Sequence, residues 1–290
     1  MEKFNSLEIS VNKKALLVGA GKWGEKIAKV LLRQNYEVKY VTRNNNQNID
    51  FESKIRSKLL SHFLYDQENF FDLVVIAVRP IDFYSAWSKY KCYSNRFLIE
   101  KPGASSRDEI NLIFSEAYAE NKLVLINYEY IYTGESLLLR EKLNKKEEFI
   151  KEISIIWEKK LFFKGGLEWR ILPHLIAEIL VISRNDLYIN STQLTDEKIK
   201  IRGKLKNANL KIEFNESDLF KYQSKIKLFD NQVFIQERNK LLHNNNIIYN
   251  QEKLSVDHMV NLCKTASSEI FMDNNNLASE ILKTIDNINV

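Results

Sequence analysis

A glycine-rich turn constrains the fold of this chain more than any other feature of its sequence. The turn reads G-x-G-x-x-G over residues 19–24, between an apolar run at 14–18 and a helical pattern that continues to residue 34. In such a turn the first glycine allows the tight bend, the second lets the backbone approach a pyrophosphate, and the third lets helix and strand pack closely. Because a helix N-terminus attracts anions, this context favours a dinucleotide site over a plain strand-to-helix turn. The residues assigned to the site are Gly19, Gly21, Lys22, Trp23 and Gly24.

The chain that follows alternates strand-like and helix-like stretches as far as residue 127. We expect strands at 37–42, 73–78, 96–99 and 123–127, helices at 52–62, 81–90 and 107–120, and a polar loop at 44–50. The run at 73–78 (LVVIAV) is apolar throughout, which is typical of a strand covered on both faces. Repeated βα units of this kind predict a doubly wound parallel sheet, a Rossmann domain at residues 1–127.

The pattern changes after residue 127. Strand signals follow one another with short polar turns and one helical pattern at 172–182; they lie at 149–157, 198–212, 224–228, 232–236 and 246–249. Consecutive strands without intervening helices predict an open, mostly antiparallel sheet in a second, α+β domain at 128–290. The last stretch, 256–288, is helical, and its helices are candidates to pack back on the first domain. The asparagine clusters at 44–46, 244–246 and 274–276 are interpreted as loops and turns.

The end of the second strand bears on which dinucleotide the chain would take. NAD sites typically carry Asp or Glu there, whereas this chain has Thr42 and Arg43. A carboxylate would repel a 2′-phosphate, whereas an arginine and a hydroxyl can hydrogen-bond to it. We therefore expect NADPH/NADP+ rather than NADH, with a solvated loop cation as the alternative interpretation of Arg43.

A lysine follows the strand at 96–99. Residues 96–103 read RFLIEKPG, which puts Lys101 just beyond the carboxyl end of that strand. In an open α/β sheet this edge faces the ligand crevice. A lysine held there can donate a proton to a carbonyl oxygen or orient it. By itself the segment fits a surface lysine in a Pro-Gly turn equally well.

The glycine turn, the segment VIAVRP at 75–80 and the segment EKP at 100–102 together resemble the Gfo/Idh/MocA family of oxidoreductases, as does the order of the two domains. The resemblance covers nearly the whole chain, loosely in the second half. It implies that Lys101 is a catalytic or substrate-orienting residue, and that the Lys101–Pro102 peptide bond is a candidate for the cis form. The cofactor contacts assigned on this basis are Val78, Pro80, Glu100 and Lys101.

The second domain of the family usually carries a glycine-rich turn and then an aspartate four residues before a histidine. The matching stretch here is residues 165–174, so His174 corresponds to the histidine and Arg170 stands in the aspartate position. The missing carboxylate makes sugar-ring alcohol oxidation less secure and favours an anionic or otherwise unusual substrate. Pro173 suits the first turn of a helix, whose positive end would keep His174 neutral. A structural histidine is the alternative, and Arg170 is either a substrate clamp or a salt-bridge residue.

The resulting hypothesis is hydride transfer between NADP(H) and a carbonyl carbon of a small polar metabolite, with Lys101 as proton donor and His174 beside it. Tyr128 and Tyr130 follow the last Rossmann strand and are assigned to the substrate cleft, with packing as the alternative. Two other functions stay open. One is reduction of a cyclic imine of the thiazolinyl type in secondary metabolism, and the other is a non-catalytic dinucleotide-sensing or regulatory role on the same scaffold.

Composition and residue spacing bear on the partners, the location and the metal content that we expect for this protein. Lys and Arg number 43 against 38 Asp and Glu, and the net charge of +5 is too evenly spread to predict a nucleic-acid partner. No apolar run approaches the length of a membrane span and the N-terminus lacks a signal-peptide pattern, so we expect a cytoplasmic location and no membrane partner. Cys92 and Cys263 have no metal-like spacing, and no metal is expected. A homodimer or homotetramer is expected through the strand-rich region at 198–250.

Overall fold

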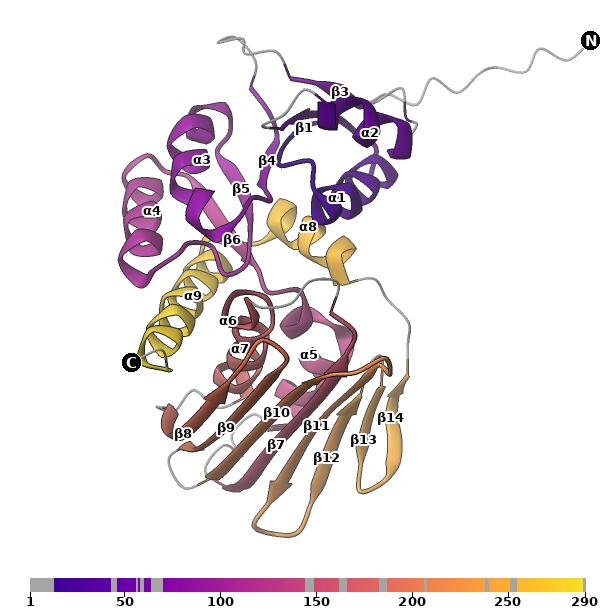
Figure 1. The fold of residues 1–290 in the computed structure, drawn as a ribbon, viewed down its shortest axis with the longest axis vertical. Coiled ribbons are helices and arrows are strands. Elements are labelled where there is room, and N and C mark those ends of the chain that lie inside the picture. The colour runs from indigo at the N-terminus through magenta and orange to yellow at the C-terminus, as the bar shows by residue number, and fades with distance from the viewer. Residues whose placement is uncertain are drawn as a thin grey trace, which may run out of the picture.

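The computed structural model describes residues 13–42, 46–55, 57, 60–63, 70–143, 149–161, 166–182, 187–205, 208–237, 240–250 and 255–288, with the backbone alone at 46–50 and 255–258. In space, the structure has one sheet at each of its two ends, and the helices α5, α6 and α7 lie between the two sheets (Figure 1). The first sheet is six-stranded and entirely parallel, in the order β3-β2-β1-β4-β5-β6. The predicted doubly wound parallel sheet is therefore confirmed.

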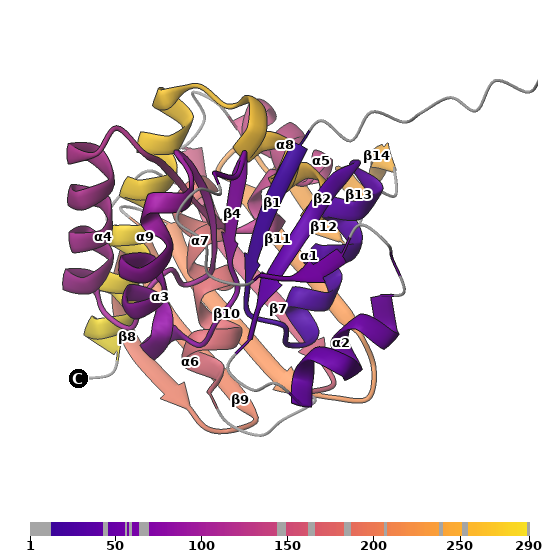
Figure 2. The same cartoon turned by 90° about the horizontal axis from the view of Figure 1, so that it is seen from above.

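The strands of the first sheet are β1 (Lys13–Val18), β2 (Tyr36–Val41), β3 (Leu60–His62), β4 (Leu73–Ile76), β5 (Arg96–Glu100) and β6 (Leu123–Asn127). Its helices are α1 (Lys22–Arg33), α2 (Asn46–Ile55), α3 (Phe83–Tyr90) and α4 (Arg107–Ala119), with 3₁₀ turns η1 (Pro80–Asp82) and η2 (Lys91–Tyr93). The two faces of the sheet belong to different apolar clusters, because alternate residues of a strand point to opposite sides. Figure 2 shows α3, α4 and α9 on one side of the sheet and α1 and α2 on the other.

The second sheet has eight strands in the order β14-β13-β12-β11-β7-β10-β9-β8, and only its β7–β10 pair is parallel. Its strands are β7 (Ile150–Lys159), β8 (Leu187–Leu194), β9 (Lys198–Leu205), β10 (Ala208–Glu216), β11 (Lys221–Leu228), β12 (Val233–Glu237), β13 (Lys240–His243) and β14 (Asn246–Asn250). The accompanying helices are η3 (Glu129–Tyr132), α5 (Gly134–Leu143), α6 (Leu167–Arg170) and α7 (Leu172–Ile182). The expectation of an open, mostly antiparallel second sheet is confirmed.

The C-terminal segment returns to the first sheet. It forms two helices, α8 (Ser255–Thr265) and α9 (Ser268–Ile288), within the stretch that the sequence analysis expected to be helical. Met259, Val260 and Cys263 of α8 pack into the apolar cluster of β1 and α1. α9 lies along the edge strand β6, where Asn274 accepts a hydrogen bond from Ile126 N at 2.6 Å and donates one to Ile126 O at 3.1 Å. The interpretation of residues 274–276 as a loop is therefore wrong.

Other errors of the sequence analysis have local physical causes. The predicted helix at 52–62 is wrong at 60–62, because Leu60 starts a strand that pairs with Val38 of β2. A short apolar run is compatible with a helix or a strand, and here pairing with the neighbouring strand of the sheet favours the strand. The helix also begins at Asn46, inside the expected loop at 44–50.

The expected strand at 198–212 is in fact a hairpin of β9 and β10. Its buried positions are odd-numbered in β9, including Ile199 and Ile201, and even-numbered in β10, including Leu210 and Ile212. This change of phase marks the turn. The strands β8 and β13 and the helix α5 were not expected at all, because each carries a weak apolar pattern.

Candidate active site

The three glycines of the first turn have different surroundings. Gly19 has a φ of +110°, and a Cβ on it would lie 2.3 Å from Ala77 O. A Cβ on Gly24 would lie 2.0 Å from Gly19 O, so only a glycine lets α1 approach the turn this closely. A Cβ on Gly21 would meet no protein atom within 4 Å. The turn is therefore tight on its protein side and open at Gly21, which is the shape that a bound pyrophosphate requires.

The start of α1 is suited to an anion. Gly21 is its N-cap and provides no side chain to accept the free N–H groups of the first turn. Lys22 is exposed and Trp23 is half-buried beside it, with Lys26 Nζ 4.5 Å from the centre of the indole ring. A negatively charged group at this position would meet both backbone N–H groups and the positive end of the helix.

The neighbouring strand ends complete this edge of the sheet. Gly19 N donates to Val41 O at 3.0 Å, so the glycine turn lies directly against the carboxyl end of β2. Thr42 follows there and is half-buried, whereas Arg43 lies outside the described residues. Val78 and Pro80 follow β4, and Val78 Cγ1 would lie 3.4 Å from a Cβ on Gly19. Apart from Arg43, the residues assigned to cofactor binding after β1, β2 and β4 thus lie along one edge of the sheet.

Lys101 follows β5 at the same edge. Its peptide bond to Pro102 is cis, as predicted. The ammonium donates to the carbonyl oxygens of Trp169 at 3.1 Å and Arg170 at 2.7 Å, which end α6 in the second domain. Burial lowers the pKa of Lys101 to about 8, against the opposing influence of Glu100 and Glu129. Lys101 is therefore a half-buried residue held between the domains and not a freely solvated lysine in a turn.

Glu100 precedes Lys101 and is buried, with 6% of its surface exposed. Asn127 Nδ2, at the end of β6, donates to Glu100 Oε1. Burial raises the pKa of the Glu100 carboxyl, the Asn127 hydrogen bond lowers it, and the carboxylate of Glu129 raises it further. Lys101 and Glu100 thus lie in surroundings that oppose charge on both, which is frequent at functional sites.

His174 lies in the first turn of α7, on the second-domain side of the same region. Its ring packs edge-on against Tyr130 with centroids 4.7 Å apart, and against Trp157 at 6.1 Å. Burial lowers its pKa well below the ordinary value, and the cations Lys101 and Lys159 lower it further. The imidazole is therefore neutral at pH 7. Its Nδ1 atom is buried and has no hydrogen-bond partner among the described residues.

The three residues assigned to the substrate lie in different places. Tyr128 is fully buried and its hydroxyl donates to Pro102 O at 3.3 Å, which is a packing position and not a cleft position. Tyr130 is half-buried and faces His174. Arg170 is half-buried, and its backbone carbonyl accepts from Lys101. The assignment of Tyr128 to the cleft is therefore corrected to packing.

Sequence reasoning missed Lys159, the last residue of β7. Its Nζ lies 5.7 Å from the centre of the Trp157 ring, and its charge lowers the pKa of both Lys101 and His174. The sequence of β7 contains a pattern that could have identified Lys159. Ile153, Ile155 and Trp157 are buried on the inner face of β7, and the period of two places Lys159 on that same face.

A parallel sheet with a glycine turn at its carboxyl edge, followed by an open mixed sheet whose helices face that edge, defines the class: a Rossmann domain joined to an α+β domain. Neither a protein-family model nor a curated protein matches the sequence. No described helix is long and apolar enough to cross a membrane, and no group of three or more His, Cys, Asp or Glu among the described residues could hold a metal ion.

Solved structures share this architecture. A Gfo/Idh/MocA family oxidoreductase from Vibrio cholerae superimposes with a TM-score of 0.71 at 13% sequence identity, covering 96% of this chain and 98% of that one. A dehydrogenase from Clostridium difficile gives a TM-score of 0.73 at 13% identity, with 96% and 98% covered. The UDP-N-acetylglucosamine 3-dehydrogenase of Acidithiobacillus ferrooxidans gives 0.75 at 12% identity, with 96% of each chain covered. The chain therefore has the fold of Gfo/Idh/MocA oxidoreductases, and the resemblance is confirmed at that level.

Proposed function

We propose that this protein is a nicotinamide-dinucleotide-dependent oxidoreductase that reduces a carbonyl carbon of a small polar metabolite, with NADPH as the preferred cofactor. The observation that carries the proposal is Lys101, a half-buried lysine of lowered pKa that interacts electrostatically with the neutral His174, on the same sheet edge as the open turn at Gly21. A bound nicotinamide supplies the hydride. The fold similarity supports the general class, since several solved neighbours are dehydrogenases or ketoreductases.

Lys101 would supply the proton. An ammonium has three N–H donors, and the carbonyl oxygens of Trp169 and Arg170 accept from it in two directions. A remaining N–H can donate to the oxygen of a substrate carbonyl and pass its proton to that oxygen as the carbon is reduced. The lowered pKa of Lys101 favours this transfer, because an ammonium group with a lower pKa is a stronger acid and gives up its proton more readily.

The surroundings of Lys101 favour an anionic substrate. Burial lowers the pKa of Lys101 and the carboxyl groups of Glu100 and Glu129 raise it, while the charges of Lys159 and Arg170 also lower it, so three cations contribute to the region in which the family aspartate is missing. A substrate carboxylate or phosphate would offset their repulsion. His174, held neutral against Tyr130, would accept or donate a hydrogen bond to a substrate hydroxyl without adding charge.

The preference for NADPH rests on the sequence TRN at 42–44, without Asp or Glu. Solved neighbours were obtained with either dinucleotide: a 3-ketoreductase from Actinomadura kijaniata with NADP, and an oxidoreductase from Agrobacterium radiobacter with NAD+. Fluorescence titration of the protein with NADPH and NADH tests the preference. Tighter binding of NADH would contradict it.

Gly21→Ala tests the cofactor site. The φ of −78° at Gly21 suits alanine and its Cβ meets no protein atom, so the melting temperature of the cofactor-free protein should not change. The same methyl group would collide with a pyrophosphate at the start of α1, and we expect at least a tenfold loss of NADPH affinity. Unchanged NADPH affinity would show that the dinucleotide does not bind at this turn.

Lys101→Met tests the chemistry. The variant keeps the volume of the side chain without its ammonium, so NADPH should still bind while turnover falls by a factor of about 100 or more, the usual contribution of a general acid. Undiminished turnover would exclude Lys101 from the reaction. Screening ketones against cyclic imines separates carbonyl from imine reduction. A protein that binds NADPH but never oxidises it with any substrate would support the sensing role.

A further inference from the structure

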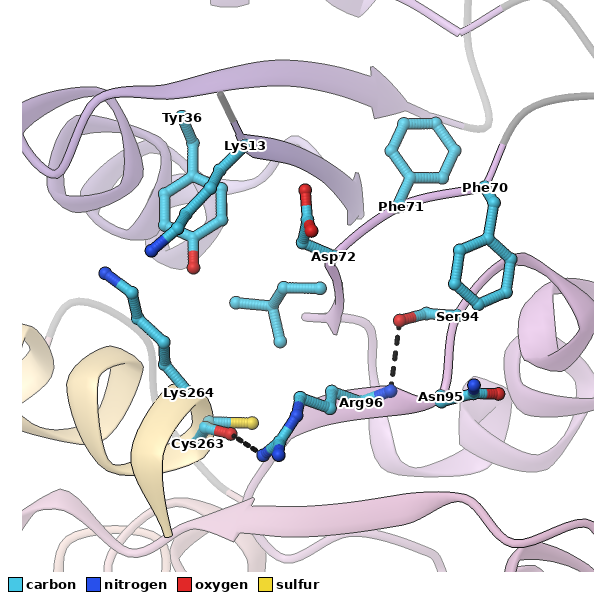
Figure 3. Close-up of a pocket in the computed structure, with 11 residues that line it drawn as sticks. Lys13, Tyr36, Phe70, Phe71, Asp72, Ser94, Asn95, Arg96, Cys263 and Lys264 are labelled. Carbon is cyan, nitrogen blue, oxygen red and sulfur yellow. Dashed lines mark hydrogen bonds between the residues drawn. The ribbon is translucent and has the colours of Figure 1, made fainter. Parts of the chain in front are cut away.

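A cavity lies at the end of the six-stranded sheet opposite to Lys101 and the glycine turn. Its volume is about 380 Å³, in the range of small-molecule sites. The first residues of four parallel strands line it: Lys13, Tyr36, Leu73 and Arg96 of β1, β2, β4 and β5. The last turn of α8 closes another side with Cys263 and Lys264 (Figure 3). The hypothesis of an oxidoreductase makes no use of this cavity.

The lining is cationic. Lys13, Arg96 and Lys264 are opposed by one described carboxylate, Asp72, whose Oδ2 already accepts the backbone N–H of Lys14 at 2.7 Å. Among the described residues no ion pair involves Lys13 or Lys264. Arg96 Nη1 donates to Cys263 O at 2.9 Å, which fixes the guanidinium against α8.

The two lysines face each other. Contact with Lys13 lowers the pKa of Lys264, and partial burial lowers it further. Figure 3 shows both ammonium groups beside the Tyr36 ring, and Lys264 Nζ lies 5.8 Å from the centre of that ring. Two ammonium groups in contact repel each other, and an anion between them would convert this repulsion into attraction.

Tyr36 adds a directed donor. The residue is 1% exposed. Burial raises the pKa of Tyr36 to about 12, and the neighbouring Cys263 and Asp72 raise it as well, so the phenol stays a neutral donor. In Figure 3 this hydroxyl points into the space beside Lys13 and Lys264. At the rim, Phe70 is 57% exposed and offers an apolar surface.

We propose that this cavity binds a phosphate monoester of a small metabolite. The dianionic phosphate lies between Lys13, Lys264 and the Tyr36 hydroxyl, with Arg96 on the sheet side, and the carbon skeleton lies against Phe70. Two lysines and a neutral phenol match the charge and the acceptor oxygens of a phosphate better than those of a single carboxylate. Since the cavity and the glycine turn lie at opposite ends of the strands, both sites can be filled at once.

Isothermal titration calorimetry with glycerol 3-phosphate tests the proposal on the full chain, and glycerol is the uncharged control probe. We expect binding of the ester and none of glycerol. Lys264→Met and Lys13→Met should each weaken the binding at least tenfold, and Tyr36→Phe should weaken it severalfold. Lys283→Met, an exposed lysine of α9 paired with Glu280, is the matched control and should bind as the wild type does.

Three results would overturn the proposal: no detectable binding of the ester, equal binding by the wild type and the Lys13/Lys264 double variant, or competition by NADPH. The last result would place the ester at the glycine turn instead. Inorganic phosphate that binds as tightly as the ester would overturn the assignment to an ester. None of these measurements depends on the proposed reductase activity, so failure of one hypothesis leaves the other intact.

Discussion

Replacing Asn274 should destabilise the protein strongly, because this side chain completes the hydrogen bonding of the edge strand β6. Asn274 is 1% exposed, and its amide both accepts from Ile126 N and donates to Ile126 O. It thus takes the place of a seventh strand at this edge.

The size of the effect follows from the two hydrogen bonds that Asn274→Ala would remove. Ile126 N would lose its partner, and a buried, unsatisfied group costs about 1–3 kcal/mol. Ile126 O would still accept from Tyr128 N at 2.9 Å, so the loss of its bond to Asn274 costs only about 0.5–1.5 kcal/mol. Alanine recovers about 0.5 kcal/mol of helix propensity. The free energy of unfolding should therefore fall by about 1–4 kcal/mol. Asn274→Leu restores the lost volume but not the hydrogen bonds, so it should recover only a small part of this loss.

Urea unfolding and amide hydrogen exchange measure the effect. The midpoint should fall for both Asn274 variants, and the amide of Ile126 should lose protection. Asn276→Ala is the matched control, because Asn276 is exposed on the same helix, and it should change the midpoint little. If Asn274→Ala and Asn276→Ala unfold alike, or if Ile126 stays protected, the hydrogen bonds between α9 and β6 contribute nothing and the reasoning fails.

Other predictions concern the glycine turn, the pH dependence and the assembly. Gly24→Ala should lower the melting temperature, since its Cβ would lie 2.0 Å from Gly19 O, and a variant as stable as Gly21→Ala would contradict this. Reductive turnover should be constant at neutral pH and fall as the pH rises through about 8, because the donor Lys101 then loses its proton; a profile without this decrease, measured with saturating NADPH, would exclude Lys101 as the donor. Light scattering after size exclusion should give a homodimer or homotetramer formed through the second sheet, and a monomer at all concentrations would refute that expectation.

Much of the first domain could be predicted from the sequence because its signals are local. The apolar runs of β4 and β6 identify buried strands, and the spacing of Gly19, Gly21 and Gly24 identifies the turn at the carboxyl end of β1. Signals were weaker in the second domain. The expected strand at 198–212 hides a hairpin, and the exposed pattern of β8 gave no strand signal because this edge strand buries little.

The sequence by itself determined the alternation of strands and helices in most of the first domain, the glycine turn and the place of Lys101 after a strand, since each depends on residues close together in the chain. Only the tertiary structure decided what surrounds them. The pKa of Lys101 is lowered by burial, and α6, whose carbonyl groups accept from the ammonium 68 and 69 residues away in sequence, lies against it. The cavity at Lys13 and Lys264 likewise exists because the end of the chain returns to the start of β1. Burial and charge proximity arise from contacts between distant segments, and no local pattern encodes them.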